Sequence, residues 1–509
     1  MPLNASGTRR VLRIRVFKGL LYLVAACALT LATVVVVFAL QARWRLPELE
    51  AWHHIELEHE FRSGRSDAPH SFEEYRSLEK QLFAELRRRV LDDPEAADSA
   101  LISHYNPRSV GATLALDTRY NQTYELVPAG EPRGAALLVH GLTDSPYSMR
   151  SLADTFLAQG YYVVVLRLPG HGTIPAGLVE VTWEDWYDAV LLAAEHAASR
   201  GGTGKPLDSA RGKPFIACGH STGAALVTLY ALRSLDDHSL PKPSDLHLVS
   251  AAIGISPLAV LTNVLSTLSF VPGFEKAKWM DVLPEYDPYK YNSFPVNAAN
   301  QIYKLTHAVR DTLNAVAPRR LEAMPRVHMY QSIVDSTVTA NEVVHGLLAR
   351  LPARGHELFV FDVNRNARME GLIAPGPLAD LERLRNAVDL PFRMTLIANH
   401  DRSTRSVAAF TREAGAREVS EKNLPYEWPP GVFSVGHVAL PFPIDDPVYG
   451  LTPPPGGEPG FNLGAIEPKG ESGALIVGLG TFARLRSNPF FDVIRSNIMA
   501  TLEPPPAAP

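Results

Sequence analysis

The sequence predicts an α/β protein with a mostly parallel central sheet that is flanked by helices. Two observations lead to this prediction. Apolar runs of the kind that form buried strands occur at residues 135–139, 161–166 and 215–218. Strand, glycine loop and helix then recur along the chain, as where residues 224–233 form a helix-like stretch after the third run. This alternation is the pattern of βαβ units, in which the strands pair in parallel.

The composition is that of a globular protein. Its 509 residues are 46% hydrophobic and 20% charged, for which a single elaborated domain is sufficient. The formal net charge is −5 and no basic block lies outside the N-terminal tail, so we expect no nucleic-acid partner. Cys27 and Cys218 are the two cysteines, which makes a disulfide framework within the chain implausible.

The segment Gly219–Gly223 reads Gly-His-Ser-Thr-Gly and lies between an apolar strand-like run and a helix-like stretch. Glycines on both sides of a serine allow a strand and a helix to pack closely around a sharp turn, which exposes the serine hydroxyl above the sheet. The first amides of the following helix could stabilise a developing oxyanion. We therefore predict that Ser221 is a catalytic nucleophile.

A serine nucleophile needs donors for the oxyanion, and the loop after residues 135–139 can supply one. That loop contains His140, Gly141 and Leu142. The amide of Leu142, together with the amide of Thr222, is the predicted oxyanion hole. His140 and His171 both lie in glycine turns, and we interpret them as structural residues whose rings hydrogen bond to the backbone.

These motifs resemble those of the α/β-hydrolases, in the branch of the monoacylglycerol lipases and serine aminopeptidases. The resemblance extends over residues 105–505 and implies an α/β-hydrolase fold. The family's upstream loop usually reads H-G-x-T-G, whereas Asp144 follows Thr143 here. Carboxylesterases and lipases are the most frequent activities of the family, so the resemblance favours esters over amides. The motifs that carry it are His140-Gly141, Pro169-Gly170-His171-Gly172, the serine turn and two motifs described next.

The predicted acid is Asp335, which follows the strand-like run 326–331. In this fold a carboxylate in a loop near the end of the sheet orients the catalytic histidine. Ser332, Asp335 and Val338 match the S/G-x-x-D-x-x-V signature of the family. Asp335 could also cap a helix after residue 336, and Asp362 is a second candidate for the acid.

Two histidines are candidates for the base. His437 lies in Ser434-Val435-Gly436-His437-Val438, which resembles the S-x-x-H-V motif of the family, and we prefer it. His400 follows the strand-like run 392–397 directly and is the alternative base. The candidate that does not act as base would be an ordinary surface or half-buried histidine.

Residues 257–325 form an insertion between the serine turn and Asp335, and they are rich in aromatic side chains. An insertion of this composition suits a lid over the catalytic serine and favours an acyl or similarly apolar substrate. The alternative is a helical excursion that packs on the sheet without touching substrate.

The N-terminal region predicts a membrane anchor. Residues 19–40 contain no charged residue and are long enough to span a bilayer as a helix. More basic residues precede this stretch, within 1–18, than closely follow it, so we expect the N-terminus in the cytoplasm and the catalytic domain on the far side of the membrane. Residues 41–105 are expected to form a helical stalk or accessory segment that leads to a hydrolase domain at 106–505.

The sequence thus predicts a membrane-anchored serine hydrolase in which Ser221, Asp335 and His437 cleave an acyl ester through an acyl-enzyme. A peptidase or an acyltransferase with the same triad, or a catalytically silent membrane scaffold, are the alternatives. The proposed acyl-enzyme mechanism needs no metal or organic cofactor. The His/Glu-rich stretch 53–60 is not expected to be a metal site, because it lacks the H-E-x-x-H register.

Overall fold

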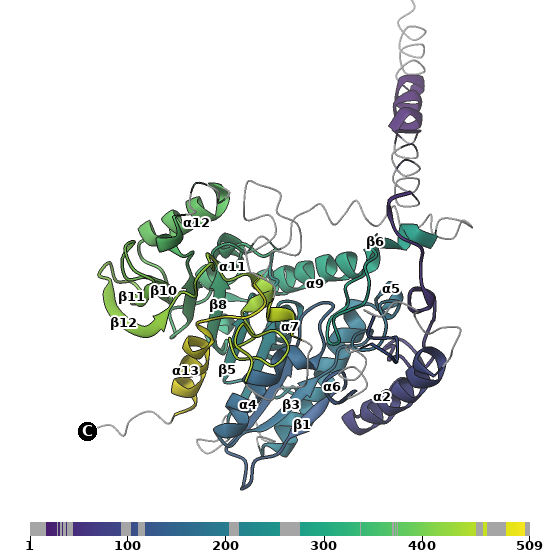
Figure 1. Cartoon of the computed structure of the whole chain (residues 1–509), viewed down its shortest axis with the longest axis horizontal. Coiled ribbons are helices and arrows are strands. Elements are labelled where there is room, and N and C mark those ends of the chain that lie inside the picture. The colour runs from purple at the N-terminus through teal and green to yellow at the C-terminus, as the bar shows by residue number, and fades with distance from the viewer. Residues whose placement is uncertain are drawn as a thin grey trace, which may run out of the picture.

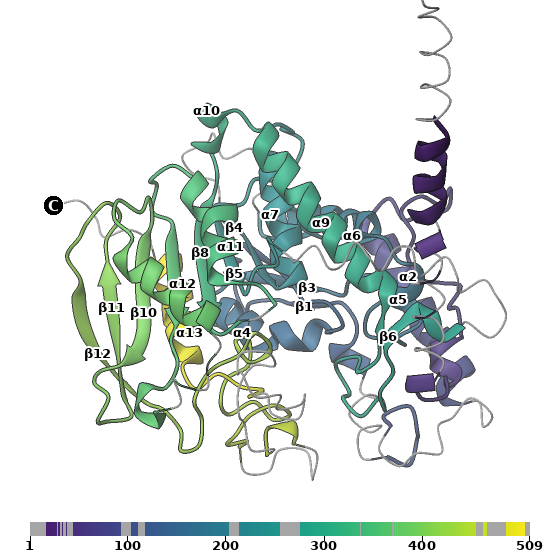
Figure 2. The same ribbon diagram turned by 90° about the horizontal axis from the view of Figure 1, so that it is seen from above.

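The structure is a computed structural model. Figures 1 and 2 show how its helices and strands are arranged. It describes residues 17–27, 29, 30, 33, 37, 44–92, 103–109, 118–202, 213–254, 275–335, 337–368, 371, 373, 375–454, 462–465 and 485–503.

A ten-stranded sheet is the centre of the molecule (Figure 2). Its strands lie in the order β1-β3-β2-β4-β5-β8-β9-β10-β11-β12. Neighbours from β3 to β10 pair in parallel, whereas β1, β11 and β12 pair antiparallel at the two ends. The predicted α/β class with a mostly parallel sheet is therefore confirmed. The bounds are β1 (Tyr124–Leu126), β2 (Ala135–Val139), β3 (Tyr162–Leu166), β4 (Phe215–His220), β5 (Asp245–Val249), β8 (Arg326–Ser332), β9 (Glu357–Phe361), β10 (Arg393–Asn399), β11 (Ser406–Arg412) and β12 (Ser420–Glu427).

The two faces of the sheet bury separate apolar cores, because successive side chains of a strand point to opposite faces. In β2, Leu137 packs in the core that includes residues of helices α6, α7 and α9, whereas Leu138 packs in the core that includes residues of α4 and α13. Both strand residues are fully buried, as expected where helices cover both faces of a parallel sheet. The helices are α4 (Arg150–Ala158), α6 (Trp183–Arg200), α7 (Thr222–Ser234), α9 (Val296–Ala315) and α13 (Phe491–Leu502).

The remaining elements surround this framework. They are α2 (Phe72–Leu86), α5 (Gly177–Glu180), α10 (Pro318–Leu321), α11 (Ala340–Gly346), α12 (Pro375–Asn386), and a two-stranded sheet of β6 (Trp279–Asp281) and β7 (Phe294–Pro295). Figure 2 shows α2 near one end of the central sheet, while β10 to β12 lie at the other end.

The segment that precedes the sheet is joined to it by a buried ion network. Arg167 follows β3, and its guanidinium contacts Glu79 of α2 at 2.9 Å and Glu60 at 3.0 Å. The Tyr75 hydroxyl of α2 donates a hydrogen bond to the Arg167 carbonyl at 2.6 Å. The segment predicted as a stalk thus packs on the domain through residues that are themselves buried.

The predicted membrane span, residues 19–40, falls only in part on described residues. Residues 17–27 form an exposed helix, drawn in purple in Figure 1. Within the described part of the chain, no helix has both the length and the apolar character needed to cross a membrane.

Candidate active site

Ser221 lies on the turn between β4 and α7, at the carboxyl end of the parallel strands. Its backbone has φ 52° and ψ −112°, a conformation that L-residues rarely adopt. The turn is held on both sides, since the Ser221 amide donates to the Val249 carbonyl at 2.9 Å and the Ser221 carbonyl accepts from the Ala252 amide at 3.1 Å. Such strain persists only where the surrounding structure fixes it, and it is typical of functional sites.

Two glycines make this turn possible, as the motif predicted. A Cβ atom on Gly219 would lie 2.4 Å from the Ala224 nitrogen, and one on Gly223 would lie 2.0 Å from the Val139 carbonyl oxygen. Both distances are far shorter than a van der Waals contact. Any larger residue would therefore push α7 away from β2 and β4.

The structure brings the predicted acid and the preferred base together. The Nδ1 atom of His437 lies 3.2 Å from the Asp335 Oδ2 atom, with the aspartate side chain fully buried. A carboxylate can only accept, so Nδ1 carries the proton in this contact and Nε2 is left as the basic nitrogen. This is the tautomer that a general base requires.

Three further donors hold the Asp335 carboxylate in place. Its Oδ1 atom accepts from the amides of Thr337 at 2.9 Å and Val338 at 2.8 Å, and its Oδ2 atom accepts from the Gln331 side-chain amide at 2.9 Å. The cap of the following helix α11 is Thr339, whose hydroxyl accepts from the Glu342 amide at 3.2 Å. The helix-cap interpretation of Asp335 therefore does not hold, and its carboxylate is oriented towards His437.

The predicted oxyanion donors both reach the site. Leu142 and Thr222 line the same cavity as Ser221, and Thr222 is the first residue of α7, where the amides have no partner within the helix. Among the residues that the structure describes, neither amide donates to a protein acceptor. Thr143 follows Leu142 with φ 64°, so the loop turns sharply at this point.

The rings of His140 and His171 hydrogen bond to the backbone of the glycine turns in which they lie, as predicted for structural residues. The His140 Nδ1 atom donates to the Gly141 carbonyl at 2.8 Å, and its Nε2 atom accepts from the Leu168 amide at 3.0 Å. The His171 Nδ1 atom donates to the Pro169 carbonyl at 3.0 Å. Burial lowers the pKa of His140 to about 4, so the ring is neutral at pH 7 and keeps this pattern of donor and acceptor.

A cavity of about 610 Å³ opens above Ser221 and His437. Its walls come from the upstream loop, from the insertion between β5 and β8, and from the segment after His437. Aromatic and aliphatic side chains dominate these walls: Leu142, Tyr147, Leu283, Tyr286, Tyr289, Tyr291, Phe294, Ile302, Val438, Phe442 and Tyr449. The volume and the apolar lining suit a small-molecule ligand with a substantial apolar part.

Both cationic side chains of the cavity wall are paired with carboxylates. Lys290 contacts Asp144 at 2.9 Å, and Arg486 contacts Asp287 at 3.0 Å. The Tyr449 hydroxyl also donates to Asp287, at 2.5 Å. The cavity therefore offers mainly apolar surface, and its two cations are neutralised locally.

The insertion has two parts with different surroundings. Several of its residues between 281 and 302 line the cavity. Further along α9, Leu305, Val309 and Leu313 are buried in the central core. Residues 257–274 of the predicted lid region lie outside the described part of the chain, so its full extent stays a prediction.

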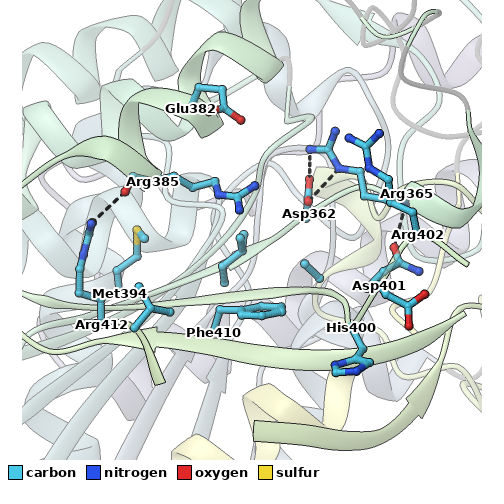
Figure 3. A pocket seen from close by; sticks show the side chains of 14 residues that line it. Asp362, Arg365, Glu382, Arg385, Met394, His400, Asp401, Arg402, Phe410 and Arg412 are labelled. Atoms are coloured by element: carbon cyan, nitrogen blue, oxygen red, sulfur yellow. Dashed lines mark hydrogen bonds and ion pairs between the residues drawn. The ribbon is translucent and has the colours of Figure 1, made fainter. Parts of the chain in front are cut away.

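The alternative acid and the alternative base lie in a different cavity, of about 390 Å³, shown in Figure 3. There Asp362 forms a two-point ion pair with Arg365, at 3.0 Å and 2.8 Å. His400 is about half exposed, with its Nδ1 atom 2.5 Å from Glu421 of β12. The structure does not bring either residue to the cavity of Ser221.

The Ser221 hydroxyl itself has no hydrogen-bond partner among the described residues. Contacts between a nucleophile and its base are often loose until substrate binds, so this geometry is compatible with a triad. No group of three or more histidine, cysteine, aspartate or glutamate side chains within the described ranges could hold a metal ion.

Gln331 and Lys290 belong to the site but carry no sequence signal. Gln331 holds Asp335 from four residues earlier in β8, and Lys290 contacts Asp144 across 146 positions of the chain. The departure from the family motif at Asp144 is the one hint in the sequence that this loop needs an additional partner.

Comparison with known proteins identifies the family to which the chain belongs. The profile of the alpha/beta hydrolase family matches residues 136–448, which is more than half of the chain. A thermostable monoacylglycerol lipase of Bacillus sp. (strain H-257) is 38% identical over 76 residues. This match covers 14% of the chain and 30% of the lipase, so the matched part of the chain spans under a third of the length of the lipase. The resemblance stated from the motifs is thereby confirmed, with a monoacylglycerol lipase among the relatives.

Solved structures of lipolytic enzymes are also similar to the chain. The monoacylglycerol lipase of Paleococcus ferrophilus is 17% identical with a TM-score of 0.34, covering 47% of this chain and 89% of the lipase. For the monoglyceride lipase of Saccharomyces cerevisiae the identity is 15% and the TM-score 0.35, covering 47% of this chain and 82% of that one. Likenesses at this level support no statement about substrate.

Proposed function

Because the chain belongs to the alpha/beta hydrolase family, we propose that it is a membrane-anchored serine hydrolase that cleaves carboxylic esters, as lipases and esterases do. One observation carries the proposal. Ser221 on its strained turn and His437, which contacts Asp335 at 3.2 Å, line one apolar cavity together with Leu142 and Thr222. A nucleophile, a base, an orienting acid and two oxyanion donors are the parts that acyl transfer needs.

In the proposed mechanism, Ser221 attacks the ester carbonyl while His437 Nε2 removes the hydroxyl proton. Asp335 holds the histidine tautomer and stabilises the imidazolium. The amides of Leu142 and Thr222 stabilise the negative charge of the tetrahedral intermediate. His437 then returns the proton to the leaving alcohol, which forms the acyl-enzyme. In the second half of the reaction, His437 removes a proton from water, which attacks the carbonyl of the acyl-enzyme. His437 then returns this proton to the Ser221 oxygen as the carboxylic acid leaves.

The character of the cavity supports an uncharged acyl ester as the substrate. Aromatic and aliphatic side chains form most of the wall, and Lys290 and Arg486 are each paired with a carboxylate. The curated relative is named a monoacylglycerol lipase, which agrees with a lipid-like ester. We propose a neutral lipid-like ester as the preferred class.

We also propose that residues 19–40 anchor the enzyme in a membrane, with the basic tail 1–18 in the cytoplasm and the catalytic domain on the far side. The uncharged stretch of residues 19–40 and the excess of basic residues before it support this topology. An enzyme held at a bilayer would have direct access to lipid-like esters.

Ester hydrolysis by membrane fractions tests both proposals. We expect cells that produce the full chain to hydrolyse p-nitrophenyl esters and monoacylglycerols, with the activity in the membrane fraction. Ser221→Ala should lower kcat by about 10⁴-fold to 10⁶-fold, because the covalent step is lost. Ser234→Ala is a matched control, since Ser234 is a buried serine at the other end of α7 that does not line the cavity.

Three outcomes would count against the proposal. Wild-type protein without ester hydrolysis would argue for a non-catalytic role, and activity that survives in Ser221→Ala would exclude this nucleophile. Transfer of the acyl group to an added alcohol in preference to water would identify an acyltransferase instead.

A further inference from the structure

Asp144 occupies a position in the upstream loop where the family usually has glycine. Its side chain is almost fully buried beside the cavity and contacts two groups. The Lys290 ammonium lies 2.9 Å from the Asp144 Oδ1 atom, and the His220 Nδ1 atom lies 3.2 Å from the Oδ2 atom. His220 directly precedes the nucleophile, so Asp144 connects the upstream loop to the serine turn.

The Asp144 carboxylate lies close to the reaction centre. A Cβ atom placed on Gly141 would lie 2.8 Å from the Asp144 Oδ2 atom and 3.3 Å from the Ser221 Cβ atom. The Asp144 Oδ2 atom and the Ser221 Cβ atom are therefore separated by no more than the sum of these two distances. A carboxylate near this centre disfavours, by charge repulsion, the oxyanion that forms when the serine attacks.

Lys290 is the group that can cancel this charge. Burial lowers the pKa of His220 despite the nearby carboxylate, so at pH 7 this ring is mainly neutral. Burial by itself would raise the pKa of Asp144, but the charge of Lys290 and the contact with His220 outweigh that effect and lower the pKa well below its ordinary value. Asp144 is thus a carboxylate whose full positive counter-charge comes from Lys290.

The counter-charge comes from the insertion, which also contacts the loop through its backbone. The Tyr291 amide, next to Lys290, donates to the Thr143 carbonyl at 2.9 Å. The Tyr291 hydroxyl in turn accepts from the Thr173 amide at 2.8 Å. Tyr291 of the insertion therefore joins the upstream loop at Thr143 to the turn at Thr173.

We propose that Lys290 is a positioning residue that neutralises Asp144 and thereby makes the oxyanion loop competent. This inference rests on the proposed serine-hydrolase function and assigns the insertion a role in the chemical step, beyond forming a wall for substrate. Lys290 acts through Asp144, so the cost of losing it depends on the charge at residue 144.

A double-mutant cycle on the full-length enzyme tests the inference. We expect Lys290→Met to lower kcat about 10-fold to 100-fold with a small change in KM, because the isolated carboxylate opposes the oxyanion in the transition state. In an Asp144→Asn background, the same Lys290→Met change should cost less than about 3-fold, since no charge is left to cancel. Lys290→Arg should retain most of the wild-type kcat.

Lys276→Met is the matched control. Lys276 belongs to the same insertion and pairs with Glu48 at 2.9 Å, but it does not line the cavity. It should leave kcat and KM unchanged. Thermal unfolding of each variant shows whether the protein is folded.

The cycle separates failure of this inference from failure of the proposed function. Equal losses of kcat from Lys290→Met in both backgrounds, or no loss in either, would overturn the inference while wild-type hydrolysis stands. A wild-type enzyme without ester hydrolysis would overturn the proposed function first.

Discussion

At the scale of single residues, the site depends on a strained serine and on the glycines around it. Ser221 has a positive φ of 52°, a conformation that costs of order 1–3 kcal/mol. The absence of a side chain at Gly219 and Gly223 permits the close approach of strand and helix that imposes this conformation. The sequence signal for this turn is strong because sterics require small residues at these two positions.

Gly223→Ala should therefore destabilise the protein. The added Cβ would lie 2.0 Å from the Val139 carbonyl oxygen, so β2 or α7 must shift, at a cost of about 3 kcal/mol in the free energy of unfolding. Gly64→Ala is the control, because no atom lies within 4 Å of its Cβ position. Urea denaturation of the two variants measures the difference. Equal stability of both would contradict the account of the turn.

Residue identity points to the proposed acid and base less directly than to the proposed nucleophile. Asp335 and His437 match short motifs, and the structure places them in contact across 102 positions of the chain. His400 is a candidate base because it follows a strand. That strand, β10, places it at the cavity of about 390 Å³, where its ring contacts Glu421. Local pattern could not decide this point, since it depends on where β10 lies in the sheet.

At the scale of elements, apolar runs predicted several of the buried strands, but strands of a different character were not predicted. The expected runs at 135–139 and 326–331 correspond to β2 and β8. In β5, polar residues alternate with apolar ones, because Asp245 pairs with His328 of the neighbouring β8 at 3.2 Å. β12 is a mostly exposed edge strand, and such strands carry polar residues instead of an apolar run.

Sequence composition also could not predict which residues are buried in two other regions, the segment that precedes the sheet and the insertion between β5 and β8. The polar, helix-prone residues predicted as a stalk include Glu60 and Glu79, which are buried because Arg167 neutralises them. In the insertion, part of the polypeptide lines the cavity while Leu305, Val309 and Leu313 of α9 pack in the core. Composition predicted an apolar insertion but could not separate these two roles.

At the scale of the whole molecule, buried histidines couple stability to pH. Burial lowers the pKa to about 4 for four histidines, although backbone hydrogen bonds partly oppose it: His53, His104, His140 and His356. Because these pKa values lie below the ordinary 6.5, the unfolded chain takes up protons first. Their contribution is fully present above pH 6.5 and is lost as the pH falls towards 4.

We therefore expect the melting temperature to fall between pH 7 and pH 5, before most carboxylates are protonated. Each such histidine costs up to about 1.4 kcal/mol per pH unit in this window. His140→Gln should reduce the slope, because the glutamine oxygen can still accept from the Leu168 amide but does not titrate. A melting temperature that is constant from pH 7 to pH 5, or an unchanged slope in His140→Gln, would contradict this expectation. Calorimetry at fixed ionic strength is the measurement.

The central claim is that Ser221 is activated by His437 in a working triad, and covalent labelling by a fluorophosphonate tests it most directly. The account predicts that the full-length wild type is labelled, that Ser221→Ala is not, and that His437→Ala is labelled at least about 10³-fold more slowly, while His400→Ala retains the wild-type rate. Folded wild type that resists the probe, or labelling that depends on His400 instead of His437, would contradict the account.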